Sequence, residues 1–212
     1  MEICFLITTY NRKESCQRLV DSLDGDIFVL NDGPQYEITG CELYYNPVHL
    51  GKTNYWHTVN SLWKLPVKKY DYYFMIPDDF LPAENGIQKA IDLWNSIKNT
   101  KKICMNLFRD RTPRDRCWTN VKPVEYKNYR LTQWVDMCFI CEERFFKEVG
   151  EIPQIRYRWD LTPLKSSGVG SYISNRLHKN RFHIYQSRES LMIEQPENNV
   201  SQLNNPNSKY PK

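Results

Sequence analysis

The first hundred residues alternate between short apolar runs and longer amphipathic stretches, and this alternation restricts the fold more than any other feature. Apolar runs typical of buried strands occupy residues 2–8, 26–32, 42–46, 72–76 and 102–108. Apolar residues at helical spacing lie between these runs, over residues 13–23, 54–64 and 85–99. Strands that alternate with helices predict an α/β fold with a mixed, mainly parallel central sheet flanked by helices.

After residue 100 the pattern is looser, and we expect its elements to complete the same domain. Residues 133–141 alternate like a strand, 142–150 form a predicted helix closed by glycine, and 169–179 form another. The length of 212 residues fits one domain. We therefore predict a single domain over residues 1–195. The Asn- and Pro-rich residues 196–212 are predicted to be a polar tail or linker that leads to further domains.

Charge and cysteine content exclude several classes of protein. The 29 basic and 25 acidic residues are interspersed and give a net charge of +4, so we expect no nucleic-acid partner. No stretch is apolar for the roughly 18 residues that a membrane span needs, and no signal peptide is evident. Seven scattered cysteines do not suggest a disulfide framework. These features predict a protein of the cytoplasm without a membrane span.

Four polar clusters are predicted to lie on one rim of the sheet. They are Thr8–Arg12, Asn31–Gly33, Leu50–Asn54 and Pro77–Asp79. Each has a local structural interpretation, because Thr and Asn cap helices and Asp-Gly forms turns. Ligands of open α/β sheets bind beyond the carboxyl ends of the strands, however, where all four clusters are expected. Their combination therefore indicates a binding site.

The residue types in these clusters suit a nucleotide. Asp32 can accept a hydrogen bond from a base, Tyr10 offers a stacking face, and the cations Arg12 and Lys52 can contact phosphates. The sequence contains neither a GxxxxGK[ST] loop nor a GxGxxG turn after a strand. ATPase and dehydrogenase functions are therefore disfavoured.

The adjacent carboxylates of Asp78 and Asp79 repel each other unless a positive charge lies between them. Mg²⁺ and Mn²⁺ prefer carboxylate and phosphate oxygens, and either ion would neutralise a departing diphosphate. We therefore predict Mn²⁺ or Mg²⁺ as the cofactor of this site.

The segments FLITTYNR, FVLNDGP, NPVHLGKTNYWHTVN and FMIPDDF, in this order and spacing, resemble the nucleotide-sugar domain of GT-A glycosyltransferases. The resemblance is specific over about the first 80 residues and looser to about residue 195. It implies a Rossmann-like GT-A fold with a nucleotide-sugar-binding half, residues 1–107, and an acceptor-side half, residues 108–195. Within the family the chain looks most like the amino-terminal domain of a large chlorella-virus protein, which implies a viral protein in the host cytoplasm.

The resemblance also implies roles for individual residues. Asp79 matches the metal ligand of the family, although Pro77 stands where a first acidic residue is usual. His183 is a second candidate metal ligand or, alternatively, a packed histidine. The implied contacts of the nucleotide sugar are Thr8, Thr9, Tyr10, Arg12, Asp32, Lys52 and Asp78.

The acceptor side needs a carboxylate that takes the proton of the attacking hydroxyl. The resemblance places this base after Phe146–Gly150, where Asp160 is the candidate base or a helix N-cap, with Asp136 as the runner-up. Trp134 and Trp159 are candidate platforms for the acceptor sugar or, equally, core residues.

We therefore expect a metal-dependent glycosyltransferase that moves a hexose or deoxyhexose from a nucleoside-diphosphate sugar to a hydroxyl of a glycan or glycoprotein. A UDP-sugar donor and inversion at the anomeric carbon are the preferred form of this hypothesis. Two alternatives stay open. A sugar-phosphate nucleotidyltransferase would need a Gly-rich triphosphate loop, which the first strand lacks, and the missing first acid is compatible with an inactive nucleotide- or glycan-binding module.

Overall fold

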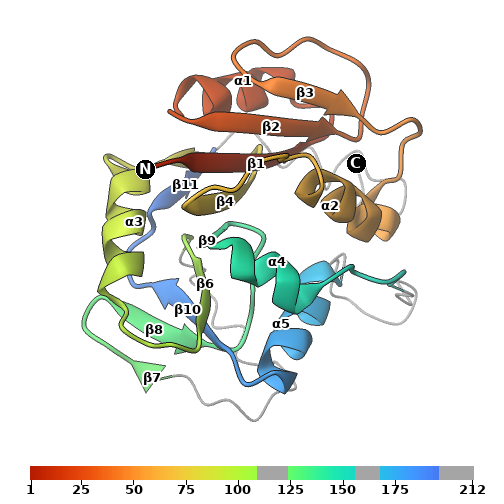
Figure 1. The fold of residues 1–212 in the computed structure, drawn as a ribbon. Helices are drawn as coiled ribbons and strands as arrows, with labels where there is room; N and C mark the ends of the chain where they lie inside the picture. The colour runs from red at the N-terminus through yellow and green to blue at the C-terminus, as the bar shows by residue number, and fades with distance from the viewer. Residues whose placement is uncertain (109–123, 156–167, 196–212) are drawn as a thin grey trace, which may run out of the picture.

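The computed structural model describes residues 1–108, 124–155 and 168–195, and a large twisted sheet runs through this part of the chain (Figure 1). Its strands, in spatial order, are β3 (Glu42–Tyr45), β2 (Asp26–Asn31), β1 (Ile3–Thr9), β4 (Tyr72–Pro77), β9 (Phe139–Cys141), β6 (Lys102–Asn106), β10 (His183–Ser187), β8 (Tyr129–Thr132) and β7 (Val124–Glu125). A separate two-stranded sheet pairs β5 (Phe80–Pro82) with β11 (Met192–Glu194).

The large sheet is mixed, and most of its strands run in the same direction. Strands β3, β2, β1 and β4 are parallel to one another, and β10 is parallel to β6. Strand β9 lies between β4 and β6 and is antiparallel to both, so β4 and β6 run in the same direction. At the far edge β8 and β7 pair antiparallel. The predicted α/β fold is confirmed, with both predicted halves contributing strands to one sheet.

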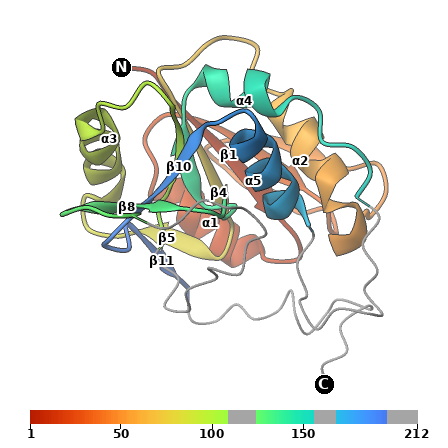
Figure 2. The ribbon, with the colours of Figure 1, turned by 90° about the horizontal axis from the view of Figure 1, so that it is seen from below.

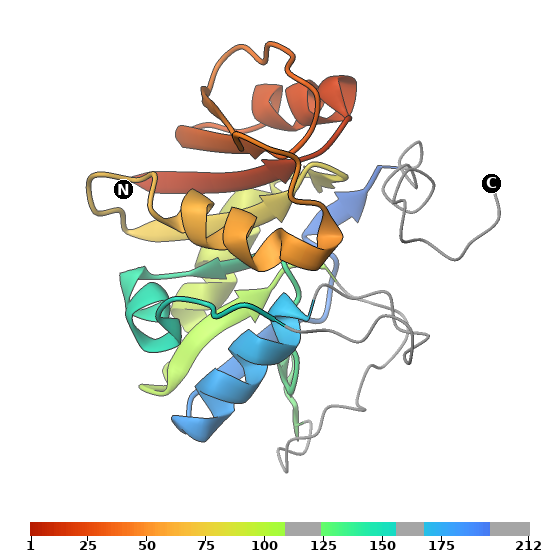
Figure 3. The ribbon, with the colours of Figure 1, turned by 90° about the vertical axis from the view of Figure 1, so that its right-hand side faces the viewer.

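Helices cover both faces of the sheet (Figures 2 and 3). They are α1 (Lys13–Asp21), α2 (Tyr55–Trp63), α3 (Gly86–Ser96), α4 (Glu143–Val149) and α5 (Val169–Lys179), with a 3₁₀ turn η1 (Lys52–Asn54). Apolar residues of α2, α4 and α5 join one core layer, and those of α1 and α3 join the other. None of the described helices is long and apolar enough to cross a membrane.

Strand β1 shows why the continuous apolar runs of the sequence form this sheet. Cys4 and Leu6 belong to the layer under α2, α4 and α5, whereas Phe5 and Ile7 belong to the layer under α1 and α3. Successive side chains of a strand point to opposite faces, so a strand covered on both sides is apolar throughout.

The prediction of a strand over residues 133–141 was wrong for its first part. Only Phe139–Cys141 forms a strand there, and the residues before it are irregular. The backbone N–H of Asp136 donates to the side-chain oxygen of Asn106 rather than to a neighbouring strand. Alternating burial in this segment therefore comes from packing against the end of β6 and not from a ladder of hydrogen bonds.

Candidate functional site

The carboxyl ends of β1, β2 and β4 bring three of the predicted polar clusters together. Thr9 pairs with Asn31 across β1 and β2, and Thr8 pairs with Pro77 across β1 and β4. The chain then leaves each strand on the same rim of the sheet, as the parallel arrangement requires. The acidic pair that follows β4 consequently lies beside the end of β1.

Asp78 is buried and its carboxylate is engaged by neighbouring protein groups. Oδ2 accepts a hydrogen bond from the Thr9 hydroxyl at 2.7 Å and a longer one from the Tyr10 N–H at 3.4 Å. Oδ1 accepts from Nη1 of Arg12 at 2.9 Å. Burial raises the pKa of Asp78 to about 6, and the charge of Arg12 opposes that rise. The contacts of Asp78 are thus those of a residue that holds the rim together.

Arg12 supplies the positive charge that the acidic pair requires. Its Nη1 lies 2.9 Å from Asp78 Oδ1 and 3.1 Å from Asp79 Oδ2, and its side chain is only 5% exposed. Burial lowers the pKa of Arg12, but the charges of Asp78 and Asp79 outweigh this effect and the net shift is upward. Arg12 was predicted to contact phosphate. The structure gives it both carboxylates as partners, and its predicted contact with phosphate stays a prediction.

Asp79 differs from its neighbour because part of its carboxylate has no protein partner. Its side chain is 24% exposed, and Oδ2 faces Arg12. Oδ1 is buried and has no hydrogen-bond partner among the described residues. Buried polar atoms are almost always paired, and leaving one unpaired is costly. This oxygen is therefore the atom of the acidic pair that is available to an added ligand.

The hydroxyl groups of Thr8 and Thr9 are held by two tyrosines that the sequence analysis missed. Tyr36, in the segment after β2, places its hydroxyl 2.7 Å from the Thr9 hydroxyl. Tyr55, the first residue of α2, places its own 3.1 Å from the Thr8 hydroxyl. Each tyrosine follows closely on a predicted polar cluster, and that proximity was the signal that could have found them.

Asp32 fixes the glycine-containing loop between β3 and α2. Its Oδ1 accepts from the Leu50 N–H and its Oδ2 from the Gly51 N–H, both at 2.8 Å. Oδ1 also accepts from the side-chain amide of Asn46 at 2.7 Å. Gly51 has a φ of +65°, a region that favours glycine. Asp32 thereby sets the position of Lys52, the next residue, while its predicted contact with a base stays a prediction.

The ring of Tyr10 is stacked within the protein. The ring of His49 lies parallel to it, with centroids 4.6 Å apart and an angle of 20° between the planes. Gly33 approaches the same ring so closely that an added Cβ would lie 2.9 Å from it. The turn after β2 therefore needs glycine here, and Tyr10 is oriented by both neighbours. Its predicted stacking on a base stays a prediction.

Gln195 clamps the acidic turn, and no role was predicted for it. Its backbone N–H donates to the carbonyl of Asp79 at 2.7 Å, and its side-chain amide donates to the carbonyls of Asp78 and Ser15. Its side-chain oxygen accepts from Nε of Arg18 at 3.0 Å. Strand β11, which ends beside Gln195, pairs with β5 directly after Asp79. Gln195 and the acidic turn are separated by more than a hundred residues in the sequence, so local sequence could not reveal these contacts.

Asp136 and Trp134 lie near the carboxyl end of β6, where Asn106 bridges them. Asn106 accepts from the Asp136 N–H at 3.0 Å and donates to the Trp134 carbonyl at 2.7 Å. Burial raises the pKa of Tyr55, and the charges of Asp79 and Asp136 raise it further. Asn106 is the last residue of β6, which runs in the same direction as β4, so Asp136 lies at the same end of the sheet as Asp79. The structure brings Asp136 to the same rim as Asp79.

The predicted metal ligand His183 is not brought to this rim. His183 is the first residue of β10 and pairs with Lys102, the first residue of β6, at the opposite end of the parallel strands from Asp79. Its Nδ1 lies 3.0 Å from the side-chain nitrogen of Asn99. The assignment of His183 as a metal ligand is therefore corrected. Trp159 and Asp160 lie outside the described residues.

The donor set on the rim fits a divalent cation that is shared with a substrate. Within the described ranges, no three His, Cys, Asp or Glu side chains gather as a ready metal cluster. Mg²⁺ commonly takes one or two carboxylates from the protein and its other ligands from phosphates and water. The buried Oδ1 of Asp79 suits such a site, whereas the carboxylate of Asp78 is already used.

Comparisons with known proteins reveal the fold. Neither a protein-family model nor a curated protein sequence matches the chain. Among solved structures, S. aureus TarS matches with a TM-score of 0.61 at 10% identity, over 92% of this chain and 37% of TarS. TarS 1-349 matches with a TM-score of 0.59 at 11% identity, over 97% of this chain and 66% of the other.

The catalytic domain of Drosophila beta1,4-galactosyltransferase 7, solved in complex with xylobiose, matches with a TM-score of 0.54. The identity is 12%, over 94% of this chain and 72% of that domain. The chain thus spans just over a third of the TarS chain and about two thirds of TarS 1-349. These neighbours are glycosyltransferases with a GT-A-like fold, and the chain shares that fold.

Proposed function

We propose that the protein is a metal-dependent glycosyltransferase. It moves a hexose or deoxyhexose from a nucleoside-diphosphate sugar, a UDP-sugar in the preferred form, to a hydroxyl of a glycan or glycoprotein, with inversion. The observation that carries the proposal is the buried Oδ1 of Asp79, which has no hydrogen-bond partner among the described residues and lies at the carboxyl-end rim of the sheet. The fold shared with a galactosyltransferase supports it.

Asp79 would hold the divalent cation, and the cation would supply positive charge to the departing diphosphate. Arg12 orients Asp79 by binding its Oδ2, which leaves Oδ1 for the cation. Asp32 fixes the loop that precedes Lys52, and the ammonium group of Lys52 contacts the diphosphate. The protein groups thus bind and orient the donor before any bond is broken.

Inversion requires a base on the acceptor side. The base takes the proton of the acceptor hydroxyl while the oxygen of that hydroxyl attacks the anomeric carbon. The nucleoside diphosphate leaves with the electrons of the broken bond. Asp136 is the described candidate, because it lies on the rim with Asp79. Asp160 is the alternative implied by the family resemblance. Trp134, whose carbonyl is held by Asn106, is the described candidate for the acceptor platform.

A donor screen tests the proposal. Release of UDP or GDP from a panel of nucleotide sugars is measured with and without Mn²⁺, for the wild type and for Asp79→Ala. We expect Mn²⁺-dependent release in the wild type and its loss in Asp79→Ala. The matched control is Asp71→Ala, which should keep full activity. Asp71 is exposed, and its carboxylate lies in space beside the amino group of Met1. Full activity of Asp79→Ala would refute the metal site.

A non-catalytic nucleotide- or glycan-binding module is the second candidate. The ion pairs of Arg12 favour it, because they balance charge at the acidic pair without any added metal. Calorimetry that detects donor binding, together with no nucleotide release across a panel of acceptors, would support this function. A sugar-phosphate nucleotidyltransferase would instead form pyrophosphate from a nucleoside triphosphate and a sugar phosphate.

The cellular setting is proposed from the sequence resemblance alone. It comprises a viral origin, a place in the host cytoplasm and further domains after the tail at residues 196–212. Fractionation of infected host cells with an antibody against the chain would test the location.

A further inference from the structure

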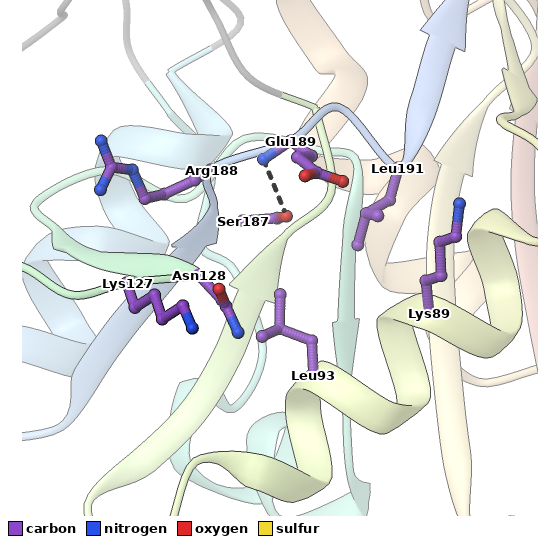
Figure 4. A pocket seen from close by; sticks show the side chains of 8 residues that line it. All are labelled: Lys89, Leu93, Lys127, Asn128, Ser187, Arg188, Glu189 and Leu191. Carbon is purple, nitrogen blue, oxygen red and sulfur yellow. Dashed lines mark hydrogen bonds between the residues drawn. The ribbon is translucent and has the colours of Figure 1, made fainter.

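A pocket lies away from the acidic turn, between α3, the turn that joins β7 to β8, and the segment after β10 (Figure 4). Its volume is about 280 Å³, close to the lower end of the range of small-molecule sites. Its lining consists of Lys89, Leu93, Lys127, Asn128, Ser187, Arg188, Glu189 and Leu191. No role proposed above uses any of these residues.

The middle of the pocket is apolar. Figure 4 shows the side chains of Leu93, from α3, and Leu191, from the segment before β11, converging there. Leu191 is only 4% exposed, and its backbone is fixed by a hydrogen bond from its N–H to the carbonyl of Leu107. A sugar ring has an apolar face of C–H groups that packs well on such a floor.

Hydrogen-bonding groups surround this floor. The hydroxyl of Ser187 accepts from the Glu189 N–H at 3.3 Å, and within the described chain its own proton has no acceptor. The side-chain amide of Asn128 forms no hydrogen bond in the same part of the structure, and Figure 4 shows it beside Leu93. The carboxylate of Glu189 can accept from a ligand hydroxyl. These groups match the ring of hydroxyls on a sugar.

The lining also carries an excess of positive charge. Lys89 and Lys127 come from opposite sides of the pocket and form no ion pair among residues that the structure describes (Figure 4). Arg188 has other partners, the carbonyl of Tyr126 and the carboxylate of Glu125, so it braces the wall. Against the two lysines stands Glu189. A ligand with one negative group can pair with Lys127, is attracted at longer range by Lys89, and leaves Glu189 for a hydroxyl.

We propose that this pocket binds an acidic sugar unit, one that carries a carboxylate or a phosphate. The ring lies over Leu93 and Leu191, the negative group faces Lys127, and the hydroxyls face Asn128, Ser187 and Glu189. The assignment of this unit to the acceptor glycan rests on the proposed function; the binding of an acidic sugar does not.

The chain connects this pocket directly to the acidic turn. Leu191 precedes β11, and Gln195 at the end of that strand donates its N–H to the carbonyl of Asp79. The carbonyl of Leu191 accepts from Ala83, directly after β5, which itself follows Asp79. An acceptor chain that is anchored in the pocket would thus be held by the same pair of strands that supports the proposed metal ligand.

Ligand-observed NMR with the full chain tests the proposal, using methyl β-D-glucuronide and its neutral counterpart methyl β-D-glucoside. We expect the glucuronide to bind about tenfold more tightly, because two partly exposed lysines contribute modestly each. Lys127→Gln should weaken glucuronide binding by about threefold or more, and Lys89→Gln should weaken it less. Lys98→Gln removes an exposed lysine just after α3, outside the lining, and is the matched control.

Equal binding of each acidic sugar and its neutral counterpart, or undetectable binding of both acidic sugars, would overturn the proposal. So would inorganic phosphate that binds as tightly as the glucuronide, because the pocket would then recognise a bare anion. Glucose 6-phosphate, compared with glucose, decides whether phosphate serves as well as carboxylate; binding of either acidic sugar supports the proposal. The test involves no donor or turnover, so its failure is distinct from loss of Mn²⁺-dependent nucleotide release.

Discussion

Nη1 of Arg12 lies 2.9 Å from Oδ1 of Asp78, in an ion pair that spans 66 residues and is buried on both sides. The pair joins the segment after β1 to the segment after β4 and thereby fixes the rim of the sheet. Removing one partner of a buried ion pair leaves the other charge buried without compensation, which strongly destabilises the fold. Arg12 is therefore expected to matter first for folding and only through Asp79 for chemistry.

Replacing Arg12 with Met should strongly destabilise the protein, because the buried Asp78 then lacks its counter-charge. We expect the free energy of unfolding in urea to fall by about 3–5 kcal/mol. The double variant Arg12→Met/Asp78→Asn should recover most of this loss, since the buried charge of Asp78 is then removed as well. Arg144→Met, at an arginine that is half exposed, is the control and should change stability little. A small loss in Arg12→Met would contradict the assigned role.

Stability should depend on pH through Asp78. Burial raises the pKa of this carboxyl to about 6 in the folded protein, above the value of about 3.9 for an aspartate in an unfolded chain. The folded state therefore holds the proton more tightly. Its stabilising contribution is complete below about pH 4 and is lost as the pH rises through about 6.

Urea unfolding of the wild type and of Asp78→Asn between about pH 4 and pH 7 measures this effect. All other groups titrate in both proteins, so the difference isolates Asp78. We expect the wild type to lose stability relative to the variant as the pH rises. A difference that stays constant over this range would show that the pKa of Asp78 is not raised.

Asp79→Asn should weaken the binding of Mn²⁺ in the presence of UDP, because an amide oxygen carries no charge for the cation. Electron paramagnetic resonance of free Mn²⁺ measures the affinity without turnover, and we expect a loss of about tenfold or more. Asp71→Asn is the surface control. Folding should tolerate the change in Asp79, since its Oδ1 has no described partner to lose. Unchanged affinity would place the metal elsewhere.

Asp32→Ala should raise the KM for the donor more than it lowers kcat, because the loop that carries Lys52 loses its anchor. The N–H groups of Leu50 and Gly51 lose a charged acceptor, and we expect stability to fall by about 1–3 kcal/mol. Steady-state kinetics over a range of donor concentrations separates the two effects. Glu37→Ala, an exposed change in the nearby segment after β2, is the control. An unaltered KM would mean that the loop does not contact the donor.

Gln195→Ala should loosen the acidic turn. The carbonyls of Asp78 and Ser15 lose their hydrogen bonds from this side chain, which we expect to cost about 1–3 kcal/mol. Hydrogen exchange of the amides in β5 and β11 should become faster while exchange in β1 stays slow. Glu194→Ala, at the exposed residue just before it, is the matched control. Uniformly faster exchange would indicate global destabilisation instead.

Much of the fold could be predicted because burial on both faces leaves a direct mark on sequence. The run from Tyr72 to Ile76 is apolar throughout, and β4 is central, with β1 on one side and β9 on the other. The error at residues 133–138 has the opposite origin. Val135 and Cys138 are buried and mimic a strand, yet the side chain of Asn106 satisfies the backbone between them. Periodicity reports burial and does not report which group accepts the hydrogen bonds.

The placement of the polar clusters at the strand ends could be predicted, but the contacts between their side chains could not. Residue types at strand ends pointed to the acidic pair and to Asp32, because parallel strands end on one rim. The distinction between Asp78 and Asp79 in the structure depends on Arg12, and the shape of the turn depends on Gln195. Those contacts join residues that are far apart in the chain, so neither spacing nor composition contains them.

The clamp of Gln195 on the acidic turn has a consequence for the growing chain on the ribosome. Gln195 emerges 117 residues after Asp78, which at about 5–20 residues per second is a delay of roughly 6–23 seconds. During that interval β1, β2 and β4 can already pair, while the turn beyond β4 still lacks its support. The nascent chain can therefore pair these strands before the acidic turn receives its support from Gln195.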